Sequence, residues 1–445
     1  MGHHDEYQVQ HGKILTRPFF VLLALVVIGF GLIAYRFIAG VGAVTGLSDG
    51  YPWGIWIAYD VATGTAFACG GYALALMIYI MNRWKYHPLI RSALLTSVFG
   101  YCLAGFSVMV DLGRYWNAYS FFLPSRWQPN SIMFEVALCV MTYSTVLIIE
   151  FLPAVLYTLE HSRWQWVRDA GQWLHPRLTP SGETLQSGLS AVSRAAGHVQ
   201  VRLDKVLIFF IVLGITLPSM HQSSLGSMMI IAGDKLHPLW QTGFLPLLFL
   251  INCIFIGYAT VMFESIISSY GFKRPYETHE LSGLAKVVPM VAGLWMAVRF
   301  GDLIWRGQIP AILAFDRNSF FFLLEMALIG GGAAMLLWRK NRLSPRMLFV
   351  SGAILMLGGG LFRFNVYLIG FNPGEGWSYF PSFAEFMITV GIVALEILGY
   401  LVLVKIFPVM PNPKKHFEEE VEEAAGELVG VPIPDAANAR VFVGK

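Results

Sequence analysis

The sequence has 445 residues, of which 56% are hydrophobic and 13% are charged, and its formal net charge is +3. Hydrophobic residues in this proportion, gathered in long blocks, exclude an ordinary soluble domain and are typical of an integral membrane protein. The four cysteines all fall in apolar segments and form no CxxC pair. This spacing argues against a disulfide framework, an iron–sulfur cluster or a zinc site, so no metal is expected in this chain.

Ten apolar segments are long enough to cross a membrane, which takes about 20 residues. They are residues 18–39, 54–81, 89–112, 130–158, 205–231, 241–268, 284–306, 317–338, 347–370 and 382–407. We therefore predict an all-α integral membrane protein with about ten transmembrane helices over residues 18–407. The first segment is too long for the apolar part of a signal peptide and is predicted as a span.

Three segments lie outside the predicted spans. Residues 1–17 form a short N-terminal segment. Residues 160–203 carry three tryptophans among arginines and then a Ser/Ala/Gly-rich stretch, which predicts an interfacial helix followed by a flexible link. Residues 408–445 are rich in glutamate and proline, and we predict a disordered acidic tail there.

The basic residues predict the orientation of the spans. If the N-terminus is cytoplasmic, 23 of the 31 Lys and Arg residues fall on the cytoplasmic side, six fall on the outer side and two lie within spans. Cytoplasmic segments of bacterial membrane proteins carry such an excess of Lys and Arg. We expect a multi-pass membrane protein with both termini in the cytoplasm.

A spaced pair of carboxylates occurs twice. Asp111 stands 24 residues before Glu135, and Asp302 stands 23 residues before Glu325, four spans later. A repeat in the same membrane direction predicts two four-helix bundles, made by spans 2–5 and 6–9, with spans 1 and 10 at their flanks. Chance similarity between apolar helices is the alternative.

The placement of the histidines argues against haem. A membrane b-type cytochrome binds haem iron through histidine pairs on facing helices. Of the eleven histidines, only His221 clearly lies within a predicted span. The sequence therefore predicts a chain without haem.

Ionisable residues within the spans gather toward the predicted outer side, where each must be paired, hydrated or neutral. A quinone needs an apolar slot, donors to its carbonyls and groups that exchange two protons. For proton exchange we predict Glu135, Asp111 and His221. For binding the ring we predict Arg114, Tyr115, Trp116, Asp60 and Asn130. The alternative is a set of structural ion pairs, such as Asp111 with Arg114 or Arg299 with Asp302.

Deeper carboxylates suggest a proton path from the cytoplasm. Glu150 lies 15 residues after Glu135 on the same predicted helix, about 22 Å further in at 1.5 Å per residue. Glu396 and Glu264 also lie toward the middle or the inner side. Isolated protonated carboxyls that are hydrogen-bonded would explain these residues equally well.

Several motifs resemble the NrfD/PsrC family of membrane anchors over most of residues 13–410. They are Tyr51-Pro-Trp-Gly-Ile-Trp-Ile-Ala-Tyr-Asp60, Gly64-Thr-Ala-Phe-Ala-Cys-Gly-Gly71, Tyr86-His-Pro-Leu89, Asp111-Leu-Gly-Arg-Tyr-Trp-Asn117, Asn130-Ser-Ile-Met-Phe-Glu135, Met220-His-Gln-Ser-Ser-Leu-Gly226, His237-Pro-Leu-Trp-Gln241 and Phe371-Asn-Pro-Gly374. The chain most resembles the branch that anchors periplasmic nickel–iron hydrogenases (the HybB type). Residues 160–203 and the acidic tail depart from shorter members.

The resemblance implies a cofactor-free helical protein with a menaquinone or ubiquinone site near its outer face. It implies that Glu135 and His221 match the family's glutamate and histidine. It also implies as partners a periplasmic ferredoxin-like iron–sulfur subunit and the small and large subunits of the hydrogenase. The lipid membrane is its medium, and no nucleic-acid partner is expected.

The leading functional hypothesis is electron transfer from the iron–sulfur subunit to quinone, with uptake of two protons. The chain would then be the quinone-reactive part of a larger hydrogen:quinone oxidoreductase. Two alternatives remain open. One is the same role in a molybdenum oxidoreductase or a multihaem cytochrome complex, and the other is a proton-coupled transporter.

Overall fold

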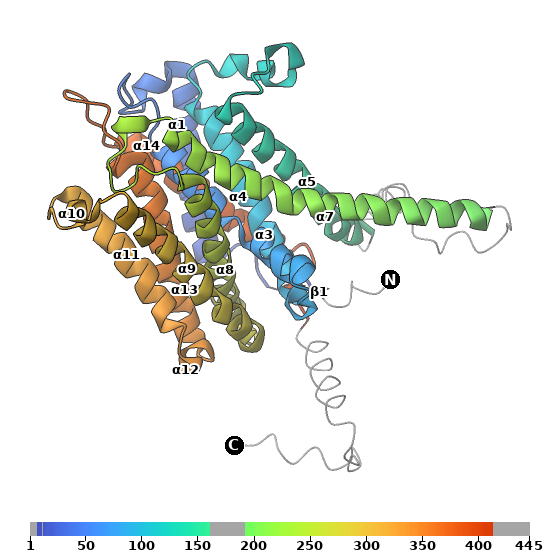
Figure 1. Ribbon diagram of the computed structural model, residues 1–445. Helices are drawn as coiled ribbons and strands as arrows, with labels where there is room; N and C mark the ends of the chain where they lie inside the picture. The colour runs from blue at the N-terminus through green and yellow to red at the C-terminus, as the bar shows by residue number, and fades with distance from the viewer. Residues whose placement is uncertain (1–6, 11, 161–191, 413–445) are drawn as a thin grey trace.

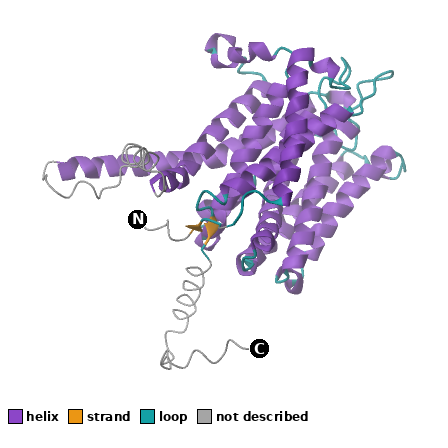
Figure 2. Cartoon of the chain, turned by 180° about the vertical axis from the view of Figure 1, so that it is seen from behind, coloured by secondary structure: helices purple, strands orange, loops and turns teal. Residues whose placement is uncertain are grey.

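The computed structural model describes residues 7–10, 12–160 and 192–412, which fold almost entirely into helices (Figures 1 and 2). In this part of the chain, nine helical segments are long and apolar enough to cross a membrane. Each overlaps one of the ten predicted spans, so the prediction of an all-helical membrane protein is confirmed. The long helices are α1 (Arg17–Ala39), α4 (Ile90–Asp111), α5 (Ile132–Glu160), α7 (Val192–Ile230), α8 (Leu245–Phe272), α9 (Thr278–Trp305), α11 (Arg317–Met335), α13 (Pro345–Phe364) and α14 (Phe383–Leu403).

The predicted span at residues 205–231 lies within α7, which packs against α5 and α8. The chain ends support a crossing here. Strand β1 (Tyr7–Gln8) pairs antiparallel with β2 (Met410–Pro411), so the chain enters and leaves the helical domain at the same end (Figure 2). A chain returns to its starting side only after an even number of crossings. With α7 the nine segments become ten, which meets this condition.

The spans form two four-helix bundles and a flanking pair, as predicted. In the first bundle, α4 contacts the second span and α5, and α7 contacts α5 and the second span. In the second bundle, α8, α9, α11 and α13 contact one another in a ring. Helices α1 and α14 pack together and against α4 (Figure 1).

The second span is broken. It was predicted as one helix over residues 54–81, but it divides into η3 (Trp56–Thr63), α2 (Gly64–Phe67), α3 (Gly70–Ala75) and η4 (Leu76–Ile80). Both η3 and η4 are π-helical, a conformation often found at functional sites. Gly257 lets α8 pack directly on this span, because a Cβ there would lie 2.6 Å from the carbonyl oxygen of Cys69. The broken span therefore lies at the junction between the bundles.

Local sequence sets several helix ends. The side chain of Thr16 caps α1, and α1 ends at Gly40, whose φ is 92°. Ser382 and Glu385 form a capping box at the start of α14. Asp316 caps α11 by accepting from the backbone N–H of Ser319. Shorter helical turns join the spans: η2 (Val41–Ala43), η5 (Trp84–Leu89), η6 (Tyr115–Phe122), η7 (Pro124–Arg126), η9 (Gly233–Lys235), α10 (Ile309–Ile312), α12 (Arg339–Arg342) and η10 (Asn365–Ile369).

Both ends of the described chain belong to the fold. Tyr7, Val409 and Met410 are buried, so residues 408–412 are packed against the helical domain. The rest of the predicted acidic tail and most of the predicted 160–203 insert lie outside the described residues. The described end of that insert, from Val192, continues directly into α7.

Replacing Gly29 by valine should destabilise the α1–α14 pair. A Cβ on Gly29 would lie 2.7 Å from the Cα of Gly391, so the two backbones must separate to admit a side chain. Overpacking of this kind costs roughly 1–3 kcal/mol. Gly31→Val is the matched control, because a Cβ at Gly31 meets nothing within 4 Å. Equal melting temperatures for the two variants in detergent would contradict this close contact.

Candidate functional site

Glu135 lies in the first turn of α5 and faces α7. The hydroxyl of Ser224 on α7 donates a hydrogen bond to its Oε1 at 2.7 Å. Its backbone N–H is bonded to the carbonyl of Ser131, the residue just before the helix. The side chain is only partly buried. The structure thus presents a carboxylate near a helix end, held by a hydroxyl instead of a basic side chain.

His221 lies one turn before Ser224 on α7 and is buried. Its Nε2 is 3.1 Å from the hydroxyl of Thr65, which lies in the broken second span. The amide of Gln222 donates to the same hydroxyl at 3.0 Å. The ring of Tyr101 meets the imidazole edge-on at 5.7 Å. In the described part of the chain, Nδ1 of His221 is buried with no hydrogen-bond partner.

Arg363 connects this polar segment to the second bundle. Its guanidinium, which is fully buried, donates to the side chains of Asn252 at 2.6 Å and Gln222 at 2.7 Å. It also donates to the carbonyls of Ala62 at 2.7 Å and Phe249 at 2.8 Å. One cation on α13 therefore satisfies acceptors on α7, α8 and the broken span.

Asp111 belongs to a second group of residues, built against α1. Its nearby cation is Arg36 of α1, whose guanidinium also donates to the carbonyl of Leu112 and lies over the ring of Tyr115. The hydroxyl of Tyr115 donates to the carbonyl of Phe37 at 3.2 Å. The structural alternative that paired Asp111 with Arg114 is not supported, because Arg114 is exposed and the charge that acts on Asp111 is that of Arg36.

The other residues predicted to hold the quinone ring differ in exposure. Arg114, Trp116 and Asn130 are exposed, and the ring of Trp116 packs edge-on against Tyr115. Asp60 is buried in the broken span, where the hydroxyl of Thr389 donates to its Oδ2 at 3.1 Å. The predicted set thus falls into a Glu135–His221 group, an Asp111–Tyr115 group, exposed loop residues and a deeper aspartate.

Two of the deeper carboxylates lie near α14. The hydroxyl of Thr389 on α14 donates to Asp60, and Glu396 lies about two turns further along that helix. The Oε1 of Glu396 is 3.6 Å from the position of a Cβ on Gly100 of α4. Glu150 lies elsewhere and faces α7, where its Oε1 is 3.3 Å from the position of a Cβ on Gly214. The two residues predicted for a proton path therefore face different helices.

The corresponding carboxylates of the second bundle are held more completely. Glu325 is fully buried and accepts from Trp240 at 3.0 Å and Asn365 at 2.8 Å, with Arg299 at 3.9 Å. Asp302 pairs with Arg306 at 2.6 Å and accepts from Thr242. The structural alternative, an ion pair between Arg299 and Asp302, is therefore not what the structure shows. Arg299 lies beside Glu325, and Asp302 pairs with Arg306. This contrast distinguishes Glu135, whose described partner is a hydroxyl.

A turn near Trp240 joins α7 to α8 outside the spans. The backbone N–H of Leu239 donates to Nδ1 of His237 at 3.3 Å, and the backbone of His237 bonds to Gly370 at 2.8 Å. Burial lowers the pKa of His237. The turn thereby positions Trp240 against Glu325.

Sequence reasoning missed several partners. Ser224, Thr65 and Arg36 were not predicted as site residues, although each contacts one of the predicted ionisable side chains or its immediate neighbour. A serine or threonine within an apolar helix does not by itself indicate, in the sequence, that it contacts a site residue. Ser224 could have been found from its position three residues after His221, on the same face of a helix.

The helical fold with this polar junction defines a polytopic membrane subunit, and the comparison with known families gives its class. The model of the family described as "Polysulphide reductase, NrfD" matches residues 43–372. The chain therefore belongs to the NrfD family of integral membrane proteins.

Individual relatives carry names of redox complexes. The "Probable Ni/Fe-hydrogenase 2 b-type cytochrome subunit" of Escherichia coli (strain K12) is 39% identical over 417 residues, covering 93% of this chain and 97% of that protein. The "Menaquinone reductase, integral membrane subunit" of Nitratidesulfovibrio vulgaris is 24% identical over 425 residues, covering 88% and 92%. A selenate reductase subunit of Mesobacillus selenatarsenatis is 20% identical over 433 residues, covering 90% and 96%.

The prediction of a chain without haem is wrong by this comparison. The Escherichia coli relative, 39% identical, is named a b-type cytochrome subunit, and b-type cytochromes are haem proteins. The sequence prediction excluded haem from the placement of the histidines and from the resemblance to a cofactor-free family, and the name of this relative overturns that exclusion.

Proposed function

We propose that this chain is the membrane subunit of a respiratory hydrogenase complex, which passes electrons from a periplasmic iron–sulfur subunit to quinone. The observation that carries the proposal is Glu135, a partly exposed carboxylate held by the hydroxyl of Ser224 at 2.7 Å. Ser224 itself lies one turn from the buried His221 on α7. The names of the hydrogenase and menaquinone reductase relatives support the same role.

Quinone reduction needs protons as well as electrons. A quinone that accepts two electrons and two protons becomes a quinol, so a proton donor must lie within reach of its carbonyls. Glu135 can give up a proton to a quinone oxygen and be reprotonated, while the Ser224 hydroxyl keeps its carboxyl in one orientation. We propose Asp111 with Arg36 and Tyr115 as the second polar group near the quinone.

The loop before α5 supplies aromatic surface beside this site. Trp116, Tyr119, Phe122 and Trp127 are exposed in or just after η6 and η7. Aromatic residues of this kind gather at membrane interfaces and in protein interfaces. We propose that Arg114, Trp116 and Asn130 serve the entry of quinone or the docking of the periplasmic iron–sulfur subunit. This assigns the loop to the outer side and both termini to the cytoplasm.

We further propose that protons reach the site from the cytoplasmic side through the carboxylates Glu264, Glu396 and Asp60. The route is supported by Asp60 accepting from Thr389 of α14, about two turns before Glu396 on the same helix. Glu150, on the opposite side of the first bundle, is proposed as a separate entry along α5 and α7.

The name of the hydrogenase relative raises the question of whether the residues of this chain could hold a haem. A b-type haem needs axial side chains, most often histidines on facing helices. Among the histidines whose burial the structure describes, only His221 is buried, and its Nε2 already contacts Thr65 at 3.1 Å. These histidines do not form such a pair.

The same fold could serve a molybdenum or selenate-type reductase, and the selenate reductase relative supports that second candidate. The higher identity to the hydrogenase relative favours the first. A transporter function draws no support from the relatives' names.

A strain that lacks this chain tests the proposal. Membranes with the chain should reduce a menaquinone analogue with hydrogen as donor, and membranes without it should lose at least 90% of that rate, a tenfold change, while hydrogen still reduces a soluble dye. Quinone reduction that persists without the chain would contradict the proposed electron transfer. If hydrogen fails to reduce quinone in wild-type membranes while another donor succeeds, the hydrogenase assignment is wrong and the second candidate stands.

A further inference from the structure

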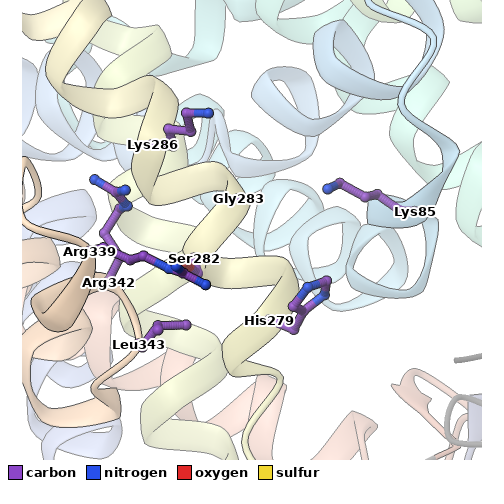
Figure 3. Close-up of a pocket in the computed structure, with 8 residues that line it drawn as sticks. All are labelled: Lys85, His279, Ser282, Gly283, Lys286, Arg339, Arg342 and Leu343. Atoms are coloured by element: carbon purple, nitrogen blue, oxygen red, sulfur yellow. The ribbon is translucent and has the colours of Figure 1, made fainter. Parts of the chain in front are cut away.

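A basic cavity lies at the end of the bundles that carries the β1–β2 pair, away from the proposed quinone site. Its volume is ≈ 310 Å³. Three segments line it: η5, the start of α9, and α12 with the residue that follows (Figure 3). The lining residues are Lys85, His279, Ser282, Gly283, Lys286, Arg339, Arg342 and Leu343. Four of these eight side chains are positively charged.

Packing between η5 and α9 creates the cavity. Tyr86 is buried against Gly283, where a Cβ would collide with its hydroxyl. This contact brings Lys85 of η5 opposite the first turns of α9. Arg342 is fixed from the other side, because its Nη1 donates to the carbonyls of Leu336 and Leu337 at 2.8 Å each. The cations are therefore held by separate elements around one space.

The charge of the cavity has one sign. The described residues that line it include no aspartate or glutamate. An acidic group beside the lining is Glu280, a buried side chain 3.8 Å from His279. Like charges repel when they are brought together, so a cluster of this kind favours an anion that neutralises it. The backbone N–H groups in the first turn of α9 add to the attraction.

The rim of the cavity has the composition of a membrane interface. Trp84 and Trp338 are exposed by 56% and 61%, and each directly precedes a lining residue along the chain. Leu337 and Leu343 are exposed by 62% and 47%. Tryptophan beside leucine at the end of a span is typical of the headgroup level of the bilayer. An anion bound here would have apolar surface beside it, against which acyl chains can pack.

We propose that this cavity binds the phosphodiester headgroup of an anionic phospholipid, with a diphosphatidylglycerol lipid preferred because four cations can neutralise two phosphates. Basic pockets between transmembrane helices are known to recognise such headgroups. The lipid would join η5 of the first bundle to α9 and α12 of the second. The distribution of Lys and Arg predicts that this leaflet is cytoplasmic.

Binding to delipidated protein in neutral detergent tests the proposal. Native mass spectrometry would count adducts of diphosphatidylglycerol, phosphatidylglycerol and phosphatidylcholine, and a titration with inorganic pyrophosphate would test a free anion. We expect diphosphatidylglycerol to bind at least tenfold more tightly than phosphatidylcholine. The Lys286→Gln/Arg339→Gln double variant should lose at least tenfold of that affinity.

The matched control removes two charges from the same end of the protein, outside the cavity. Lys340→Gln/Arg346→Gln should bind like the wild type, because both side chains are exposed and neither lines the cavity. An equal loss of lipid affinity in both double variants would show that the overall positive charge of this end, and not the cavity, attracts the lipid, and would overturn the proposal. If pyrophosphate binds as tightly as the lipid, the ligand of the cavity is a free phosphate compound and the lipid proposal is wrong. If the first double variant melts early without lipid, Lys85→Gln on η5 provides the same comparison.

Discussion

Replacing Glu135 by glutamine is expected to slow hydrogen-to-quinone electron transfer about 100-fold, the lower range for loss of a general acid or base. Glutamine can still accept the hydrogen bond from Ser224, so the local structure should persist, but it cannot give a proton to quinone. Transfer of electrons from hydrogen to a soluble dye should not change, because the dye takes electrons before they reach this chain.

Two further variants sharpen this test. Glu375→Gln removes an exposed carboxylate from the loop between η10 and α14 and should leave both rates unchanged. Ser224→Ala leaves the acid in place but removes its 2.7 Å partner, and a loss smaller than that of Glu135→Gln is expected. An equal fall in the quinone and dye rates for Glu135→Gln would assign the residue a role in assembly instead of proton transfer.

Arg363→Met should be the most destabilising single substitution at the junction of the bundles. Methionine fills a similar volume but leaves the side-chain oxygens of Asn252 and Gln222 and two backbone carbonyls without their donor. Each buried acceptor left without its donor costs about 1–3 kcal/mol. We expect poor accumulation in membranes and an early, broad melting transition in detergent.

Arg346→Met on the same helix is the control, since Arg346 is exposed near the start of α13. Arg363→Lys keeps the charge but loses the planar fork that reaches several acceptors at once, so its stability should fall between the two. A melting temperature for Arg363→Met close to that of Arg346→Met would refute the role of Arg363 in holding the bundles together.

Much of the fold could be predicted from hydropathy and charge. Each apolar segment buries its own backbone hydrogen bonds, so its length alone identifies a span. The repeated Asp–Glu spacing predicted which spans form each bundle, because equal spacings put equal faces inward. The interruption of the second span was not predicted. Its glycines permit the break, but the packing of α8 against it decides where the helix deforms.

The candidate site was predictable by residue type and much less by pairing. Glu135 and His221 were predicted as site residues because ionisable groups within a span are costly and are often functional, and their role stays a prediction. Their partners come from other helices, and separation along the chain gives no measure of distance in space. Arg114 is three residues from Asp111, whereas Arg36 is 75 residues away, yet Arg36 is the cation whose charge acts on Asp111. Helix α4 ends at Asp111, so Arg114 lies beyond the helix and is exposed.

The pairing of α1 with α14 has a consequence for how the protein is made. Helix α1 leaves the ribosome well before α14, yet Gly29 and Gly391 require each other's backbone as their neighbour. The face of α1 that packs against α14 therefore remains without this partner in the membrane while the spans between them are synthesised. The strand pair at Tyr7 and Pro411 can close only after α14 has been synthesised, so this part of the fold forms after all of the spans between α1 and α14 have been made.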